Sequence, residues 1–295
     1  MEILVAKSAG FCFGVEKAIE SVYKEIETGK KPIYTFGPII HNEQVVEDLE
    51  EKGVSVIDTI EELENLQSGS VVIRSHGVPK KIYDAIEKQN LEIVDATCPF
   101  VKKIHNIVKK ESEEGKKIVI IGNDNHPEVE GIKGWVVGEA IVIKDEEDIE
   151  KIDSFRNESI CIVSQTTFNY NKFKYLVEII TKKGYDINVV NTICNATHLR
   201  QVEAKEIASK VDAMIVIGGK NSSNTQKLYD ICKNECKDTY YIQTVSNLNL
   251  KNVDSLRSIG ITAGASTPKK IIEEVVLNVR DEFWTNVGWI IQDNS

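Results

Sequence analysis

Apolar and polar residues alternate along this chain in one recurring order. A short apolar run is followed by a loop of small or polar residues, and then by a stretch whose apolar residues recur every three or four positions. Short apolar runs are typical of buried strands, and the second spacing is typical of amphipathic helices. Strands that alternate with helices predict parallel α/β sheets with right-handed crossovers.

This order groups into a threefold repeat. In each repeat the first loop carries a cysteine and the second begins at a glycine, with Cys-to-Gly spacings of 25, 24 and 24 residues. The cysteines are Cys12, Cys98 and Cys194, and the glycines are Gly37, Gly122 and Gly218. We therefore expect three similar α/β domains over residues 1–92, 93–188 and 189–282 and a C-terminal tail over 283–295.

The three cysteines occupy equivalent loops that follow predicted strands. Ligands of parallel sheets bind beyond the carboxyl ends of the strands. A pseudo-threefold arrangement would therefore bring Cys12, Cys98 and Cys194 together. Zinc, an iron–sulfur cluster and three buried thiols without metal all stay open, although zinc usually takes four ligands with local Cys pairs. A four-iron cluster normally takes four thiolates, so three would leave one iron open to substrate.

The other three cysteines give no such pattern. Cys161 lies in the apolar run 159–164, which predicts a core position. Cys232 and Cys236 are four residues apart near the end of a predicted helix, and we expect surface or half-buried thiols there.

Polar side chains in the second and third loops indicate an anion site. Imidazoles, hydroxyls, amides and backbone N–H groups at helix starts all bind phosphate groups well. No P-loop motif is present, and Gly10 and Gly14 alone do not make a dinucleotide fingerprint. The candidate anion-binding residues are His41, His76, His126, Gln165, Thr166, Ser222, Ser223, Asn224 and Ser266.

Glu128 follows His126 by two residues, in HPEVEG. It can be read as an acidic residue at a helix start, which the helix dipole favours. It can also be read as a proton donor beside a bound substrate oxygen.

Composition narrows the location and the partners. The 295-residue chain carries a net charge of −10, which disfavours nucleic-acid binding. It has no apolar run long enough to span a membrane and no secretion-signal pattern. We expect a cytoplasmic protein without membrane or nucleic-acid partners.

Taken together, these motifs resemble one family. AGFCFGVEKAI, GPIIHNEQVV, RSHGVP, DATCPFVKK, HPEVEG, SQTT, TICNAT followed by RQ, GGKNSSN and TAGASTP occur in this order over about residues 1 to 280. The chain resembles the 4-hydroxy-3-methylbut-2-enyl diphosphate reductase family. The resemblance implies a trefoil-like monomer around a [4Fe–4S] cluster held by Cys12, Cys98 and Cys194, with an open iron and a [3Fe–4S] form after oxidation.

The resemblance also implies the reaction and the residues that perform it. The expected activity is two-electron reductive dehydroxylation to isopentenyl and dimethylallyl diphosphate, with electrons from ferredoxin or flavodoxin. Glu128, Thr166 and His126 form the implied catalytic set. The implied substrate-binding set is His41, His76, His126, Thr166, Ser222, Ser223, Asn224 and Ser266. An iron–sulfur hydro-lyase, a non-enzymatic cluster sensor and a zinc hydrolase are the alternatives.

Overall fold

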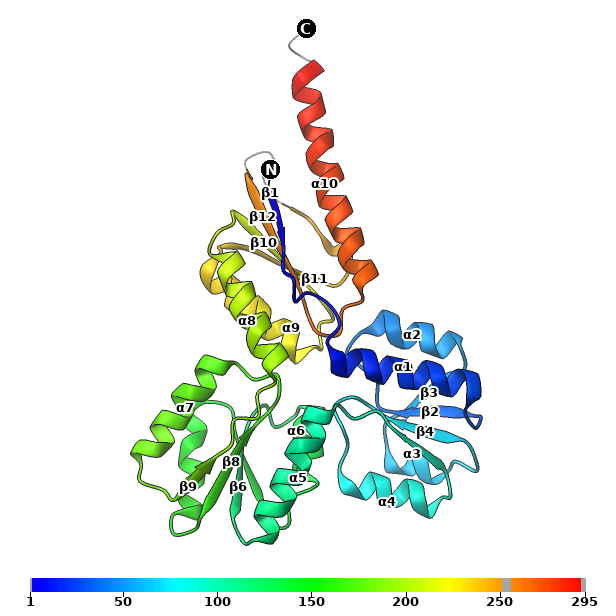
Figure 1. The fold of residues 1–295 in the computed structure, drawn as a ribbon, viewed down its shortest axis with the longest axis vertical. Coiled ribbons are helices and arrows are strands. Elements are labelled where there is room, and N and C mark those ends of the chain that lie inside the picture. The colour runs from blue at the N-terminus through cyan, green and yellow to red at the C-terminus, as the bar shows by residue number, and fades with distance from the viewer. Residues whose placement is uncertain (1, 251–255, 293–295) are drawn as a thin grey trace. The chain divides into compact units, whose positions relative to one another are not determined.

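Three four-stranded parallel sheets make up the framework of the chain (Figure 1). The computed structural model describes residues 2–250 and 256–292, and for residues 282–292 it describes the backbone only. The chain divides into two compact units. Unit 1 comprises Met1–Cys12 and Asn195–Ser295 and contains one sheet, whereas unit 2 comprises Phe13–Cys194 and contains the other two.

The first sheet of unit 2, sheet B, has the strand order β3-β2-β4-β5. Its strands are β2 (Ile33–Phe36), β3 (Val54–Ile57), β4 (Ser70–Ile73) and β5 (Glu92–Asp95). The helices of this part are α1 (Phe13–Thr28), α2 (Glu43–Glu51), α3 (Ile60–Glu64) and α4 (Lys80–Lys88).

The second sheet of unit 2, sheet C, has the matching order β7-β6-β8-β9. Its strands are β6 (Lys117–Ile121), β7 (Ala140–Ile143), β8 (Ile160–Ser164) and β9 (Ile187–Val189). The helices are α5 (Pro99–Glu113), α6 (Pro127–Lys133), α7 (Tyr170–Lys182) and the 3₁₀ segment η1 (Glu146–Phe155). Helices α5 and α6 pack on one face of this sheet, while η1 and α7 pack on the other.

Unit 1 contains sheet A, with the order β1-β12-β10-β11. Its strands are β1 (Glu2–Val5), β10 (Ala213–Ile217), β11 (Asp238–Ile242) and β12 (Ser258–Ala263). The helices are α8 (Asn195–Ala208), α9 (Ser223–Glu235), the 3₁₀ segment η2 (Val245–Asn247) and α10 (Lys269–Gln292). Helices α8 and α9 cover one face of the sheet, and α10 covers the other. Side chains of the predicted tail lie outside the described residues, although its backbone continues α10 to Gln292.

The expectation of three similar parallel α/β parts is confirmed by the shared strand order. The sheets are offset from the sequence repeats by one strand, because each cysteine-bearing loop follows the last strand of one sheet and precedes a helix of the next. Strand β5 ends sheet B before Cys98, β9 ends sheet C before Cys194, and β1 joins sheet A before Cys12. The division at 92/93 and 188/189 falls inside β5 and β9, and it stays a prediction.

Two cysteines are placed differently from our expectation. Cys161 is buried in β8, as predicted, but Cys232 and Cys236 are also buried, at 0% and 4% exposure. They pack with Ala204 and Leu228 between α8, α9 and sheet A. The expected surface or half-buried thiols are therefore wrong, because the helix turns this pair inward. Within the described residues, no helix combines the length and the apolar composition that a membrane span requires.

Strand β1 offers a test of how sheet A closes. The N–H of Glu2 donates to the carbonyl of Arg257, the residue before β12, and the N–H of Ala6 donates to the carbonyl of Ile261 in β12, both at 2.8 Å. Alternate residues of a parallel strand face the same neighbour, so the N–H of Leu4 also faces β12 and that of Ile3 faces the outer edge. We expect Leu4→Pro to destabilise unit 1 by roughly 3 kcal/mol and Ile3→Pro to cost clearly less. Hydrogen exchange of the β12 amides measures the difference, and equal effects would contradict this pairing.

Candidate functional site

Each predicted ligand cysteine is held by the same backbone hydrogen bond. The N–H groups of Cys98 and Cys194 donate to the carbonyls of Ser75 and Thr166, both at 3.0 Å. The N–H of Cys12 donates to the carbonyl of Ala265 at 3.3 Å. Each accepting residue lies two positions beyond the end of the third strand of its sheet, β4, β8 or β12. The equivalence predicted from the sequence is thus present at the level of single hydrogen bonds.

A second repeated contact fixes the loops that carry the anion-binding candidates. The N–H groups of the three loop glycines donate to the carbonyl of the last residue of the neighbouring strand, at 2.7 to 2.9 Å. These pairs are Gly37 with Ile57, Gly122 with Ile143, and Gly218 with Ile242. His41, His126 and Ser222 each follow their glycine by four residues. The three loops therefore present their polar side chains from the same position of each sheet.

The six cysteines fall into two groups by environment. Cys12, Cys98 and Cys194 are partly exposed in their loops, whereas the other three are buried in the cores. Burial raises the pKa of Cys161 to about 11 and that of Cys232 to about 12. A thiol must lose its proton to bind a metal, so the buried group is poorly suited to be ligands. The three loop thiols are less buried, and Cys thiolates are the usual ligands of iron–sulfur clusters.

Unit 2 brings three predicted imidazoles together. The ring centroids of His41 and His76 are 4.4 Å apart, and His126 lies 5.7 and 5.6 Å from them. Burial, reinforced by the charge of Arg74, lowers the pKa of His41 to about 4. Burial lowers the pKa of His76 well below its usual value, and His41, His126 and Arg74 add to this effect. These two rings are neutral near neutral pH.

The hydrogen bonding of His126 decides what the imidazole cluster suits. Three imidazoles whose ligand atoms lie within 4.8 Å of one another could hold a metal ion. However, Nδ1 of His126 accepts the backbone N–H of Glu128 at 3.1 Å, as the N-cap of α6. A neutral ring with an accepting Nδ1 carries its proton on Nε2, which is then a donor and not a metal ligand. The cluster is therefore better suited to an anion.

Glu128 is the buried acid of this site. Its side chain is 1% exposed, and burial raises its pKa to about 7 although two hydrogen bonds from Thr166 oppose the shift. The backbone N–H and the Oγ1 hydroxyl of Thr166 donate to its two carboxyl oxygens, both at 2.6 Å. A carboxyl with a pKa near neutral can give and regain a proton at physiological pH. Since the Thr166 carbonyl also accepts from Cys194, one residue joins the acid to a cysteine loop.

An aromatic group that sequence reasoning missed holds the loop of His76. The indole Nε1 of Trp135 donates to the carbonyl of Val78 at 3.0 Å. The ring of His105 stacks on Trp135 with centroids 5.3 Å apart. A Cβ on Gly77 would lie 2.6 Å from His105 Cε1, so glycine is needed for this close approach, and its φ is +70°. The fixed Gly77 places its neighbour His76 in the cluster.

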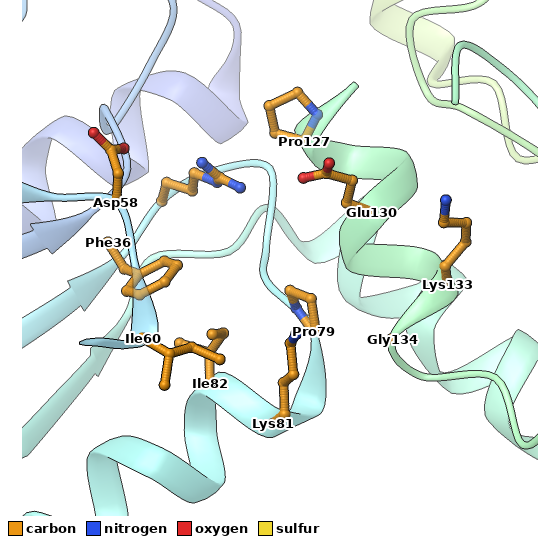
Figure 2. A pocket seen from close by; sticks show the side chains of 11 residues that line it. Phe36, Asp58, Ile60, Pro79, Lys81, Ile82, Pro127, Glu130, Lys133 and Gly134 are labelled. Atoms are coloured by element: carbon orange, nitrogen blue, oxygen red, sulfur yellow. The ribbon is translucent and has the colours of Figure 1, made fainter. Parts of the chain in front are cut away.

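Arg74 is a second residue that the sequence analysis overlooked. It lines a cavity of about 690 Å³ in unit 2, and Asp58 and Glu130 face that cavity from opposite sides (Figure 2). Burial lowers the pKa of the Arg74 guanidinium, and the charges of Glu130 and Asp58 act against this shift. The positive charge of Arg74 also acts on His41 and His76. Its position two residues before the candidate His76 was the sequence feature that could have identified it.

Unit 1 contributes a separate polar turn at the start of α9. Ser222 caps this helix and accepts from the N–H and the hydroxyl of Thr225, at 3.3 and 2.9 Å. Asn224 is only 3% exposed, and both polar atoms of its amide lack a partner among the described residues. Ser266, in the loop after β12, is buried at 7% exposure. A buried amide without partners points to a ligand that would satisfy it.

Fold and site together define a class of protein. It is an α/β repeat enzyme with three cysteines in equivalent loops, a buried acid whose pKa is about 7, and polar side chains that could bind an anion. The chain matches the LytB protein family over residues 3–280. It therefore belongs to the LytB family, whose curated relatives are 4-hydroxy-3-methylbut-2-enyl diphosphate reductases, iron–sulfur oxidoreductases of isoprenoid biosynthesis.

Relatives match the chain over nearly its whole length. The reductase of Caldanaerobacter subterraneus subsp. tengcongensis is 49% identical over 95% of this chain and 97% of its own length. The reductase of Clostridioides difficile is 46% identical over 94% and 98%. These relatives confirm the family that the motifs indicated.

Solved structures give the same result. A structure of (E)-4-hydroxy-3-methyl-but-2-enyl diphosphate reductase, described as the terminal enzyme of the non-mevalonate pathway, is 41% identical with a TM-score of 0.70. It aligns over 95% of this chain and 100% of its own. The Plasmodium falciparum enzyme is 29% identical with a TM-score of 0.88, over 94% of this chain and 87% of its own.

The raised pKa of Glu128 predicts how stability depends on pH. Its carboxyl binds a proton below about pH 7 in the folded protein but only below about pH 4.5 in the unfolded chain. The contribution of the Glu128 carboxyl to the free energy of unfolding is thus fully present below the pKa of the unfolded chain. It is lost as pH rises through the pKa of the folded protein. Glu128→Gln does not titrate, so it should gain up to roughly 3 kcal/mol relative to the native chain between about pH 5 and about pH 8.

Denaturant unfolding at the two pH values measures this gain. Glu130→Gln is the matched control, because Glu130 lies on the same helix but is exposed. A stability difference between Glu128→Gln and the native chain that does not change with pH would mean that Glu128 is ionised in the folded protein.

Proposed function

We propose that this chain catalyses the two-electron reductive dehydroxylation of (E)-4-hydroxy-3-methylbut-2-enyl diphosphate to isopentenyl diphosphate and dimethylallyl diphosphate. The observation that carries the residue-level proposal is the buried Glu128 carboxyl. It accepts hydrogen bonds from the N–H and the hydroxyl of Thr166, whose carbonyl accepts the N–H of Cys194. A proton donor is thereby tied to one of the thiols assigned to the redox centre.

Cys12, Cys98 and Cys194 are assigned as the ligands of a [4Fe–4S] cluster. Their partly exposed thiols and matching backbone contacts support this assignment. Three thiolates leave one iron without a protein ligand, and loss of that iron on oxidation would give a [3Fe–4S] form. When bound, the cluster would pass on the two electrons of the external donor one at a time and would provide a Lewis-acidic iron.

Glu128 is assigned the proton transfer. The reaction consumes two electrons and two protons, breaks the allylic C–O bond and releases the hydroxyl as water. A neutral Glu128 can give one proton to the leaving hydroxyl, and the second ends on the carbon skeleton. Thr166 orients the carboxyl through its hydroxyl and its N–H. His126 completes the catalytic set, since its Nδ1 holds the backbone N–H of Glu128 and its Nε2–H can donate to substrate.

Diphosphate binding is assigned to two groups of residues. In unit 2 these are His41 and His76, whose neutral rings can each donate an N–H group, together with His126 and with Thr166, which contacts Glu128. In unit 1 they are Ser222, Ser223, Asn224 and Ser266. The Asn224 amide, whose polar atoms have no partner within the described part of the chain, supports this role. The positive charge of Arg74 near His41 and His76 would favour an anion there.

An external one-electron donor, ferredoxin or flavodoxin, and a cytoplasmic location complete the proposal. The sequence has no nicotinamide or flavin motif, which favours an external donor.

Turnover by anaerobically purified protein tests the activity. We expect conversion of the substrate to the two diphosphates only when a reductant is added. Release of water without added reductant would indicate an iron–sulfur hydro-lyase instead. Zinc in place of iron and sulfide would favour a zinc hydrolase. Iron and sulfide without any spectral change on diphosphate addition would favour a sensor.

Glu128→Gln serves as the internal control of this assay. It should retain native iron and sulfide and lose turnover by roughly 10² to 10⁴, the range of general acid catalysis. Native turnover in this variant would remove Glu128 from the mechanism without affecting the assignment of the cysteines.

A matched pair of cysteine variants tests the ligand assignment. Cys98→Ala removes a proposed ligand, and Cys161→Ala removes a buried core thiol that has no such role. We expect Cys98→Ala to lose most of its iron and acid-labile sulfide and Cys161→Ala to keep both. Equal metal content in the two proteins would overturn the assignment.

A further inference from the structure

The chain segment that leads to Cys12 is longer than its two counterparts. Three residues occupy equivalent positions of their sheets, namely Val5, Ile93 and Val189. Each pairs with a residue of the neighbouring strand, and four positions after that residue comes the one whose carbonyl accepts the cysteine N–H. Cys98 and Cys194 follow this position by five residues, whereas Cys12 follows it by seven. A longer loop costs more conformational entropy to fix.

The two shorter segments carry an Asx turn that the longer one lacks, although the longer one has a β-turn in which the Ala9 N–H donates to the Ala6 carbonyl at 3.1 Å. Oδ1 of Asp95 accepts the N–H of Thr97 at 3.0 Å, and Oδ1 of Asn191 accepts the N–H of Ile193 at 3.1 Å. Both residues lie three positions before their cysteine. At the corresponding position before Cys12 the chain has Ala9, whose side chain cannot accept a hydrogen bond.

Two side chains of α8 supply the missing contacts. The Arg200 guanidinium donates to the carbonyl of Ser8 through Nε at 2.8 Å and Nη2 at 2.5 Å, and to that of Gly10 at 2.8 Å. The Glu203 carboxylate accepts the N–H groups of Lys7 and Ser8 at 2.8 and 2.9 Å and also the Ser8 hydroxyl. A charged side chain thus accepts from the N–H groups of the segment, and another donates to its carbonyls. Hydrogen bonds to charged groups are stronger than those between neutral groups.

The position of Arg200 in α8 is occupied by an apolar residue in each of the two equivalent helices, α1 and α5. Counted from the cysteine, Arg200 corresponds to Ala18 in α1 and Ile104 in α5, which are buried at 0% and 1% exposure. Arg200 is itself only 3% exposed. A buried guanidinium is costly unless it is well hydrogen bonded, so its presence at an otherwise apolar position requires a specific contact.

We propose that Arg200 and Glu203 are positioning residues that fix the segment Lys7–Gly10 and thereby hold the Cys12 thiol in place as a cluster ligand. The role of Arg200 and Glu203 in holding a cluster ligand rests on the proposed function. Their hydrogen bonds to the segment Lys7–Gly10, called the clamp below, do not.

Three variants of the anaerobically purified holoenzyme test this proposal. Arg200→Met removes the guanidinium but keeps a long side chain, and Glu203→Gln is a milder change that removes the carboxylate. Lys205→Met is the control, because Lys205 lies on α8 and pairs with Glu235 at 3.3 Å. All three should bind native amounts of iron when freshly prepared.

The first measurement is amide hydrogen exchange at Lys7, Ser8 and Cys12, which does not require a metal. We expect exchange to be roughly tenfold faster or more in both clamp variants and unchanged in the control. Native exchange rates in both clamp variants would overturn the clamp. Because this readout is independent of the cluster, it still decides the point if the native protein proves to contain no iron or sulfide.

The second measurement maps the alkylation of each cysteine by iodoacetamide, together with iron release to a chelator. In the clamp variants we expect Cys12 to react first, roughly tenfold faster than in the native protein, with iron release accelerated in parallel. Native rates at Cys12 would separate the clamp from cluster binding and overturn the proposal. Equal acceleration at all six cysteines, including the buried Cys232 and Cys236, would indicate general destabilisation and would overturn it as well.

Discussion

The site depends on one backbone hydrogen bond that occurs three times, from a cysteine N–H to a carbonyl two residues beyond the third strand of a sheet. This bond anchors the cysteine to the sheet whose last strand it follows, although the next helix belongs to the following sheet. A loop between two sheets would otherwise be free to move with either. The hydrogen bond therefore fixes the cysteine backbone relative to that sheet. A metal ligand requires a fixed position of this kind.

Equivalent positions of the repeat have acquired different chemistry. Four residues after the loop glycine, the chain has His41, His126 and Ser222, and the last two cap their helices. At the carbonyl that holds the cysteine it has Ser75, Thr166 and Ala265, of which only Thr166 also binds the buried acid. The backbone contacts are retained in all three repeats because they set the geometry. The side chains at these positions differ, so the three loops offer different chemistry on the same backbone framework.

Much of this organisation could be predicted from the sequence, for definite physical reasons. Strand and helix periodicity and the Cys-to-Gly spacing follow directly from residue order, so the three parallel sheets and the equivalent cysteine loops were accessible. The pairing of β1 with β12 was not, because residues 2–5 and 258–263 are joined only by tertiary structure. Arg74, Trp135 and the Arg200–Glu203 pair were missed for the same reason. Arg200 did leave a signal, since it lies four and eight residues before the buried Ala204 and Ala208 on the inward face of α8.

In the proposed mechanism, burial of Glu128 would serve both acid chemistry and anion binding. A carboxylate beside the imidazole cluster would repel a diphosphate, and removing it from water makes the charged form unfavourable. Burial alone would raise the pKa further and make the proton hard to release. The two hydrogen bonds from Thr166 stabilise the charged form and act in the opposite direction. The balance leaves the pKa near 7, so the carboxyl can both hold and release a proton near neutral pH. Thr166, whose carbonyl also accepts the Cys194 N–H, is therefore the residue that sets this balance beside a cysteine loop.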